Sequence, residues 1–191
     1  MDNCTVANQT PEEIAQKISP IATALQDISE QSAETPLVKE AARTLREFSI
    51  RRDVQRSDWD AAAKAFLDIN IFQIFSNFIK IKNQWSKEKD PASNGYASLL
   101  NISGTVLMLT DASPLACQEA LKRDTIKIVI DDINGVLSSL PLISTFLLIE
   151  IGILNNLSLH KESIEKFREV NAVELLLKIY QKQEMYAYHI F

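Results

Sequence analysis

The residues best suited to chemistry in this sequence are few and far apart. The two histidines, His160 and His189, lie in a predicted loop and in the tail. Neither is close in the sequence to Cys4 or Cys117, or to a serine in a nucleophile motif. A phosphate-binding glycine loop and a dinucleotide fingerprint are absent as well. We therefore predict that this chain is not an enzyme and has no catalytic, cofactor or metal site.

Paired carboxylates and clustered arginines are the other groups with chemical potential. Asp131 and Asp132 are adjacent on a predicted helix and point in different directions, which is unsuited to shared acid/base work. Forked guanidinium groups could bind an acidic peptide or a phosphate, and five of them cluster at Arg43, Arg46, Arg51, Arg52 and Arg56. Aspartates at positions 53, 58 and 60 lie nearby. A solvated, self-compensating face is the favoured interpretation.

The charge balance bears on the partners. The net charge is −5, and the first 35 residues account for it with six acidic residues against Lys17. A nucleic-acid-binding module would carry a basic excess, because it must displace counterions from phosphates. We therefore predict a protein partner and no nucleic acid.

The N-terminus and the longest apolar stretch bear on the compartment. The start of the chain lacks the basic region and apolar core of a signal peptide, and the two cysteines have no disulfide or metal spacing. The apolar stretch over residues 136–154 contains Pro141, Glu150 and several hydroxyls, which favours buried helices over a membrane span. We predict a cytoplasmic protein, with the nucleus as the alternative, and no membrane partner.

The sequence predicts helices along the whole chain. N-cap residues precede proline or a capping-box acid at Thr10, Thr35, Ser57 and Ser113, and strand signals are nearly absent. Apolar residues at three- and four-residue intervals then predict helices. Their ranges are 11–32, 36–52, 59–67, 69–81, 96–110, 115–121, 126–140, 142–157, 164–170 and 173–180.

Two segments of the chain resemble each other at a spacing of 47 residues. With this shift Leu107 aligns with Leu154, Cys117 with Ile164, and Thr125 with Ala172. A period of forty-odd residues that contains two or three helices is typical of the armadillo and HEAT class.

The second of these segments is similar to an armadillo repeat over residues 142–180. ILNNLS resembles the end of a third helix, IEKFREVNAV a first helix that turns into a second, and ELLLKIY the second helix. Asn171 occupies the turn where the family usually has glycine, and asparagine tolerates the left-handed conformation required there. The resemblance is less close over residues 95–140. It implies an all-α, right-handed α-α superhelix with about two recognisable repeats.

We expect a single armadillo-like domain over residues 1–191. Residues 1–10 are predicted to be disordered, 11–56 to form divergent helices, 57–183 to form the repeats and 184–191 to be a tail. The last repeat has only its first two helices, so it should expose the face that a third helix would cover. This predicts pairing with another chain, including self-association through the C-terminal end, or a continuation beyond residue 191.

The resemblance places the third helices on a concave, partner-binding surface. Asparagine amides there could both donate to and accept from an extended peptide backbone, although they could equally cap helix ends or bond to neighbouring turns. With the 47-residue shift, each of two sets lies on one helix face, namely Ser98, Asn101, Thr105 and Met108, and Thr145, Leu148, Gly152 and Asn155. The predicted partner-binding residues are Ser98, Asn101, Thr105, Thr145 and Asn155.

Three further residues bear on this predicted binding surface. Gly152 stands four residues before Asn156, where family members use tryptophan to bind basic peptides, so that version of the function is disfavoured. Asn101 resembles the same asparagine at a spacing of 55, but we prefer the 47-residue register. Glu150 is surrounded by apolar residues, and we expect it to face solvent or to meet an arginine of the next repeat; the alternative is a functional site.

These patterns together favour a non-enzymatic scaffold or adaptor that binds a partner segment on the concave face of a helical solenoid. The alternative is a regulatory or oligomerising armadillo domain of a larger signalling enzyme.

Overall fold

The structure is a computed structural model that describes residues 11–26, 28–49, 59–84, 93–137 and 145–188. Over these ranges the regular structure is α-helical and contains no strand, which confirms the all-α prediction. The predicted cap Ser57, the arginines at 51, 52 and 56, and the residues 1–10 that were predicted to be disordered lie outside the described residues. Of the predicted tail over residues 184–191, residues 184–188 are helical and continue the last helix, which was predicted to end at residue 180, and residues 189–191 lie outside the described residues.

The N-terminal part of the chain forms helices α1 (Pro11–Gln26), α2 (Glu30–Ala33) and α3 (Pro36–Ser49). The single helix predicted over residues 11–32 is therefore wrong, because α1 ends at Gln26. The Ser29 backbone N–H donates to Ser32 Oγ at 2.7 Å, and the Ser32 N–H donates to Ser29 Oγ at 3.2 Å. Serine side chains that bond to nearby backbone compete with helix continuation, and here they start a new turn.

The rest of the chain repeats an order of short, intermediate and long helices. The bounds are α4 (Trp59–Asp68), α5 (Ile71–Gln84), α6 (Asn94–Ala112), α7 (Pro114–Lys122), α8 (Thr125–Leu137), α9 (Thr145–Ser158), α10 (Ser163–Glu169) and α11 (Ala172–Tyr188). Two predicted N-caps are confirmed, because the Val38 N–H donates to Thr35 Oγ1 at 3.3 Å and the Ala116 N–H donates to Ser113 Oγ at 3.2 Å.

The turns between short and intermediate helices share one backbone feature. Asn70, Asp124 and Asn171 have positive φ angles of 57°, 54° and 50°, respectively. Asparagine and aspartate reach this left-handed region at less cost than most residues, so each ends one helix and lets the next begin. Helices α8 and α11 begin 47 residues apart, at Thr125 and Ala172.

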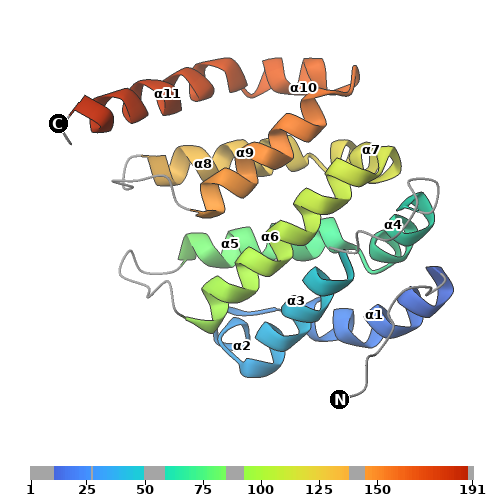
Figure 1. Ribbon diagram of the computed structural model, residues 1–191. Coiled ribbons are helices and arrows are strands. Elements are labelled where there is room, and N and C mark those ends of the chain that lie inside the picture. The colour runs from blue at the N-terminus through green and yellow to red at the C-terminus, as the bar shows by residue number, and fades with distance from the viewer. Residues whose placement is uncertain (1–10, 27, 50–58, 85–92, 138–144, 189–191) are drawn as a thin grey trace.

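The helices stack in layers (Figure 1). Helices α3, α6 and α9 lie side by side in the front of the view, with α6 packed between the other two. Helices α5, α8 and α11 form a row behind them, and α1, α4 and α7 run along one side. The core between the rows is built largely from aliphatic and phenylalanine side chains, including Phe66, Phe75, Phe78, Leu99, Ile102 and Leu109.

Among the described residues, no helix combines the length and the hydropathy that a bilayer crossing requires.

Candidate functional site

Two of the predicted partner-binding residues are inaccessible. Ser98 and Thr105 are fully buried, because α6 is covered by α3 and α9. Their hydroxyls donate to carbonyls of their own helix, to Asn94 O at 2.7 Å and to Asn101 O at 2.9 Å. The prediction that Ser98 and Thr105 face a partner is therefore wrong.

The other three predicted residues lie on the surface. Asn101 is half-buried on α6, whereas Thr145 and Asn155 are exposed on α9. Leu148 lies between them in the sequence and is 57% exposed. Residues 145, 148 and 155 fall on one side of a helix of 3.6 residues per turn. We refer to Thr145, Leu148 and Asn155 as the α9 face.

The edge of the α9 face that carries Gly152 and Asn156 docks against α6. The Asn156 side chain donates to Leu107 O and to Thr110 Oγ1, both at 3.3 Å. A Cβ atom on Gly152 would lie 2.8 Å from Leu107 Cδ1, so a larger side chain at 152 would require Leu107 to move. Asn156 therefore joins two helices, and Gly152 allows their close approach.

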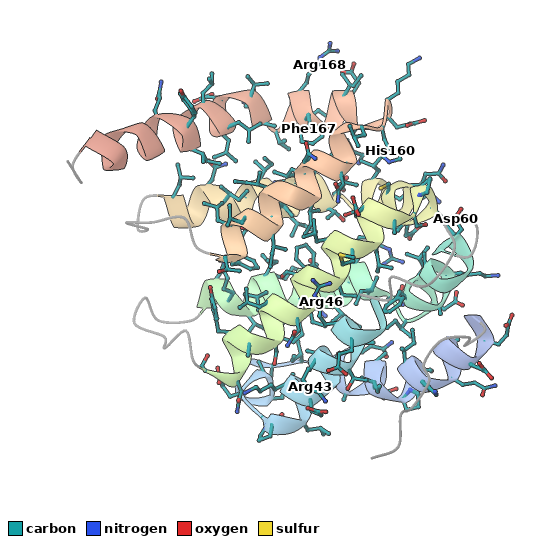
Figure 2. The ribbon with its side chains drawn as sticks, in the orientation of Figure 1. Arg43, Arg46, Asp60, His160, Phe167 and Arg168 are labelled. Carbon is teal, nitrogen blue, oxygen red and sulfur yellow. The ribbon has the colours of Figure 1, made fainter. Side chains whose placement is uncertain are left out.

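The arginines on α3 have separate structural roles. The Arg46 guanidinium donates from Nη1 to Gly104 O at 2.9 Å and lies across the exposed side of α6 (Figure 2). Burial lowers the pKa of Arg46 from its ordinary value. Arg43 is exposed and pairs with Glu40 and Glu47 on its own helix. The described part of the arginine cluster is thus engaged within the chain, but with other partners than the expected aspartates: Asp60 accepts a hydrogen bond from Ser113, and positions 53 and 58 lie outside the described residues.

A buried charged cluster joins three helices of the core. Lys82 on α5 pairs with Asp132 on α8, and their side chains are 12% and 0% exposed. The Lys82 Nζ also lies 4.3 Å from the centroid of the Phe146 ring on α9. Glu150, also on α9, is fully buried beside Asp132.

The protonation of Glu150 follows from this environment. Burial raises the pKa of Glu150 well above 4.5, the Asp132 carboxylate raises it further, and Lys82 opposes the shift. Both carboxyl oxygens of Glu150 and the Oδ1 atom of Asp132 lack a donor among the described residues. When Glu150 is protonated, its O–H group supplies the missing hydrogen-bond donor for Asp132. The expectation that Glu150 faces solvent or meets an arginine is therefore wrong; its partners are an aspartate and a lysine.

The remaining reactive side chains occupy structural positions. Cys117 is a buried free thiol whose Sγ donates to Thr110 O at 3.0 Å, and burial together with Asp111 raises its pKa to about 11. His160 lies in the turn after α9, where its carbonyl accepts from Ser163. Over the described ranges, no group of three or more His, Cys, Asp or Glu side chains is arranged to hold a metal ion.

Exposed apolar side chains gather at the C-terminal end of the stack. Six of the nine large apolar side chains that are exposed among the described residues belong to this end, namely Leu159, Ile164, Val173, Leu176, Leu177 and Tyr180. We refer to these six residues as the apolar C-terminal face. Contiguous apolar surface of this type marks protein-interaction sites.

Two hollows flank α10. One, of about 440 Å³, lies against α8 and is lined by charged residues, among them Lys127 and Lys166, which pair with Asp131 at 2.6 Å and Asp124 at 2.5 Å. The other, of about 510 Å³, has a largely apolar lining that includes Ile164, Phe167, Ala172 and Val173. The apolar hollow is continuous with the exposed side chains at the start of α11.

Comparison of the chain with protein-family models, curated proteins and solved structures found no match. Among the described residues, two exposed surfaces are candidates for contact with a partner, namely the α9 face and the apolar face at the C-terminal end. The buried cluster of Lys82, Asp132 and Glu150 joins α5, α8 and α9, and sequence spacing could not predict it, since its members are 18 to 68 positions apart.

Proposed function

We propose that this chain is a non-enzymatic protein-interaction scaffold of the armadillo type, which binds a partner segment on the outer face of α6 and α9. The layered stacking of α3, α6 and α9, and the left-handed turn residues at matching positions, support this assignment. Stacked helices present a long surface that needs no specialised pocket.

The observation that carries the proposal is the composition of the α9 face. Leu148 is 57% exposed, and it lies between the hydrogen-bonding side chains of Thr145 and Asn155. An apolar anchor flanked by groups that donate and accept suits an extended segment, because the anchor supplies affinity and the polar groups fix the register. Asn101 on the neighbouring helix α6 is half-buried.

The partner segment should be neutral and carry an apolar residue. Position 152 holds glycine in place of the tryptophan that recognises basic peptides in armadillo proteins, and a larger side chain there would require Leu107 to move. The exposed groups of the α9 face are uncharged. A cytoplasmic or nuclear protein is therefore the proposed partner, in preference to nucleic acid or a membrane.

Affinity capture followed by titration of the purified partner tests the proposal. We expect Leu148→Glu to weaken partner binding by at least about tenfold, since a charge in an apolar contact costs more than about 1.4 kcal/mol. Asn155→Ala should weaken it by a smaller factor. The matched control is Leu37→Glu on α3, where the native leucine is 70% exposed.

The proposal fails if a partner that binds the wild-type chain binds Leu148→Glu and Leu37→Glu with the same affinity. Substrate turnover by the isolated chain would contradict the non-enzymatic assignment. The second candidate function, an oligomerising domain of a larger signalling enzyme, is favoured by the apolar C-terminal face, which is a separate surface from the α9 face.

A further inference from the structure

Helix α9 contains a single charged residue, Glu150, and this side chain is fully buried. It lies beside the Asp132 carboxyl of α8, which is paired with Lys82 of α5. The side chains of Asp132 and Lys82 are 0% and 12% exposed. The buried cluster therefore sets two carboxyl groups against one lysine in the core.

The charge of the buried cluster depends on one proton. With Glu150 protonated, its O–H group donates to Asp132, and the positive charge of Lys82 balances the negative charge of Asp132. With Glu150 ionised, one negative charge is in excess, and both Glu150 oxygens and Asp132 Oδ1 lack a donor among the described residues. A buried charge without a partner is costly, so ionisation favours an arrangement in which Glu150 reaches solvent.

The other helices around α9 do not neutralise this excess charge. Asp132 and Lys82 are the charged groups that shift the pKa of Glu150. The other titratable residues of α6, Tyr96 and Asp111, and Cys117 of α7 supply no positive charge. On α7, α8 and α10 the ion pairs are Glu119 with Lys122 and Arg123, Lys127 with Asp131, Glu165 with Arg168, and Lys166 with Asp124, while Lys80 of α5 and Glu169 of α10 are exposed.

The two halves of α9 are held in the stack by different contacts. In the first half, Phe146 and Leu147 are buried together with Glu150, and Lys82 Nζ lies 4.3 Å from the centroid of the Phe146 ring. In the second half the buried side chains are aliphatic, and the Asn156 side chain makes two hydrogen bonds of 3.3 Å to α6. The buried cluster therefore acts on the first half of the helix.

We propose that the buried cluster is a proton-dependent switch for the α9 face: the first half of α9 is docked on α5 and α8 while Glu150 is protonated, and loss of that proton releases it. The inference rests on the proposed function, because it assigns a regulation to the same face. Release moves Thr145 and Leu148 away from Asn155, which stays with the anchored second half. The face then loses affinity for its partner segment as the pH rises.

The direction of the pH effect follows from the two states of Glu150. In the docked helix, burial and the Asp132 carboxylate raise the pKa of Glu150, and this pKa falls back toward 4.5 when the first half of α9 opens to solvent. The docked helix therefore keeps a proton that the open helix releases above pH 4.5. The fraction of open helix rises with pH, by at most about tenfold for each pH unit, and levels off above the docked pKa.

Amide hydrogen exchange of the 191-residue chain from pH 5 to 9 tests the switch. The reference is Glu150→Gln, whose amide keeps the cluster neutral in total at every pH. The ratio of wild-type to Glu150→Gln exchange rates, taken at one pH, cancels the intrinsic pH dependence of exchange and the titration of other groups such as His160. We expect this ratio to rise with pH for the amides of residues 149–152, which bond to carbonyls of the first turn, and to stay constant for residues 154–158.

Two further variants separate the switch from a general loss of stability. Asp132→Asn leaves one carboxylate for Lys82, so the cluster is balanced when Glu150 is ionised, and the rise of exchange with pH should disappear. Glu165→Gln makes the same chemical change as Glu150→Gln at a side chain that is 75% exposed, and it should exchange like the wild type.

A constant ratio over residues 149–152 would overturn the proposal. An equal rise in both halves of α9 would also overturn it, because Glu150 would then act on unfolding of the whole chain. A rise that persists in Asp132→Asn would contradict the role of the second carboxylate.

Titration of the partner purified by affinity capture tests the consequence for binding. The dissociation constant of the wild type should increase with pH relative to that of Glu150→Gln. If Leu148→Glu weakens binding but the wild type and Glu150→Gln show the same pH dependence, the regulation is wrong and the binding function stands. If Leu148→Glu has no effect, the proposed function fails and the regulation of binding with it, whereas the exchange experiment, which uses no partner, still decides the release of α9.

Discussion

At the scale of single residues, Glu150 links protonation to folding. The folded protein surrounds this carboxyl with apolar side chains and with Asp132, while Lys82 is already paired with that aspartate. The pKa of Glu150 is raised above its ordinary value of 4.5, so the folded chain holds a proton that the unfolded chain releases. The stability from this group is complete below pH 4.5 and is lost as the pH rises toward the folded pKa.

We therefore predict that Glu150→Gln stabilises the protein at neutral pH. The glutamine amide carries a hydrogen-bond donor for Asp132 at every pH. The variant therefore folds at neutral pH without having to bind a proton at position 150. The gain in unfolding free energy should be present at pH 7, should shrink as the pH falls, and should vanish near pH 4.5. Urea denaturation at a series of pH values measures it.

The exposed pair Glu165–Arg168 supplies the control for this experiment. Glu165 is 75% exposed, so Glu165→Gln makes the same chemical change in solvent and is the control variant. A Glu150→Gln variant whose stability runs parallel to that of the wild type from pH 4.5 to 8 would show that Glu150 carries no raised pKa.

Arg46 and Arg43 allow a matched comparison on one helix. Arg46 donates to Gly104 O on α6, so Arg46→Leu should lower the unfolding free energy by about 1–2 kcal/mol through the lost charge-assisted hydrogen bond. Arg43 pairs with its own helix in solvent, and Arg43→Leu should change stability much less. Thermal and urea denaturation compare the two, and equal losses would contradict the role of Arg46 between helices.

At the scale of the elements, the turns between helices depend on left-handed residues. Asn171 has φ 50°, so Asn171→Val should destabilise the protein by about 1–2 kcal/mol, because a β-branched residue is strained in this region. Asn171→Gly should be tolerated. Asn134→Val, an exposed change inside α8, is the control, and urea denaturation is the measurement. A loss for Asn134→Val as large as that for Asn171→Val would contradict the turn argument.

Most of the helices could be predicted from the sequence, because N-caps and apolar periodicity are local features of the chain. Thr35 and Ser113 cap α3 and α7 as expected, and α10 and α11 meet at the turn predicted at Asn171. The break after Gln26 was missed, because the serine bonds that restart the chain leave the apolar spacing intact.

The placement of side chains across helices was less predictable. Periodicity puts Ser98 and Thr105 on one face of α6, but it does not say which neighbouring helix covers that face. The partners of Glu150 come from α5 and α8, far along the chain, so the apolar run around it indicated burial without naming Asp132 or Lys82. Asn101, Thr145 and Asn155 are accessible, and their role in partner binding stays a prediction.

At the scale of the whole molecule, the stack has two unequal ends. Helices α1 and α3 pack on α4 and α6 and close the N-terminal side, whereas α10 and α11 carry exposed apolar side chains at the other. The α9 face lies beside this open end, in the front row of helices (Figure 1). The proposed partner-binding surface therefore lies next to the end of the stack at which exposed apolar side chains gather.

The central claim is that the α9 face contacts a partner segment, and site-specific photo-crosslinking tests it most directly. A photoreactive phenylalanine analogue would replace Leu148 in one protein and Leu37 in another, since both leucines are more than half exposed. We predict one dominant adduct at position 148, mapped by mass spectrometry to a neutral segment of another protein, and none at position 37. The same adducts at both positions, or none at 148 while the partner is bound, would contradict it.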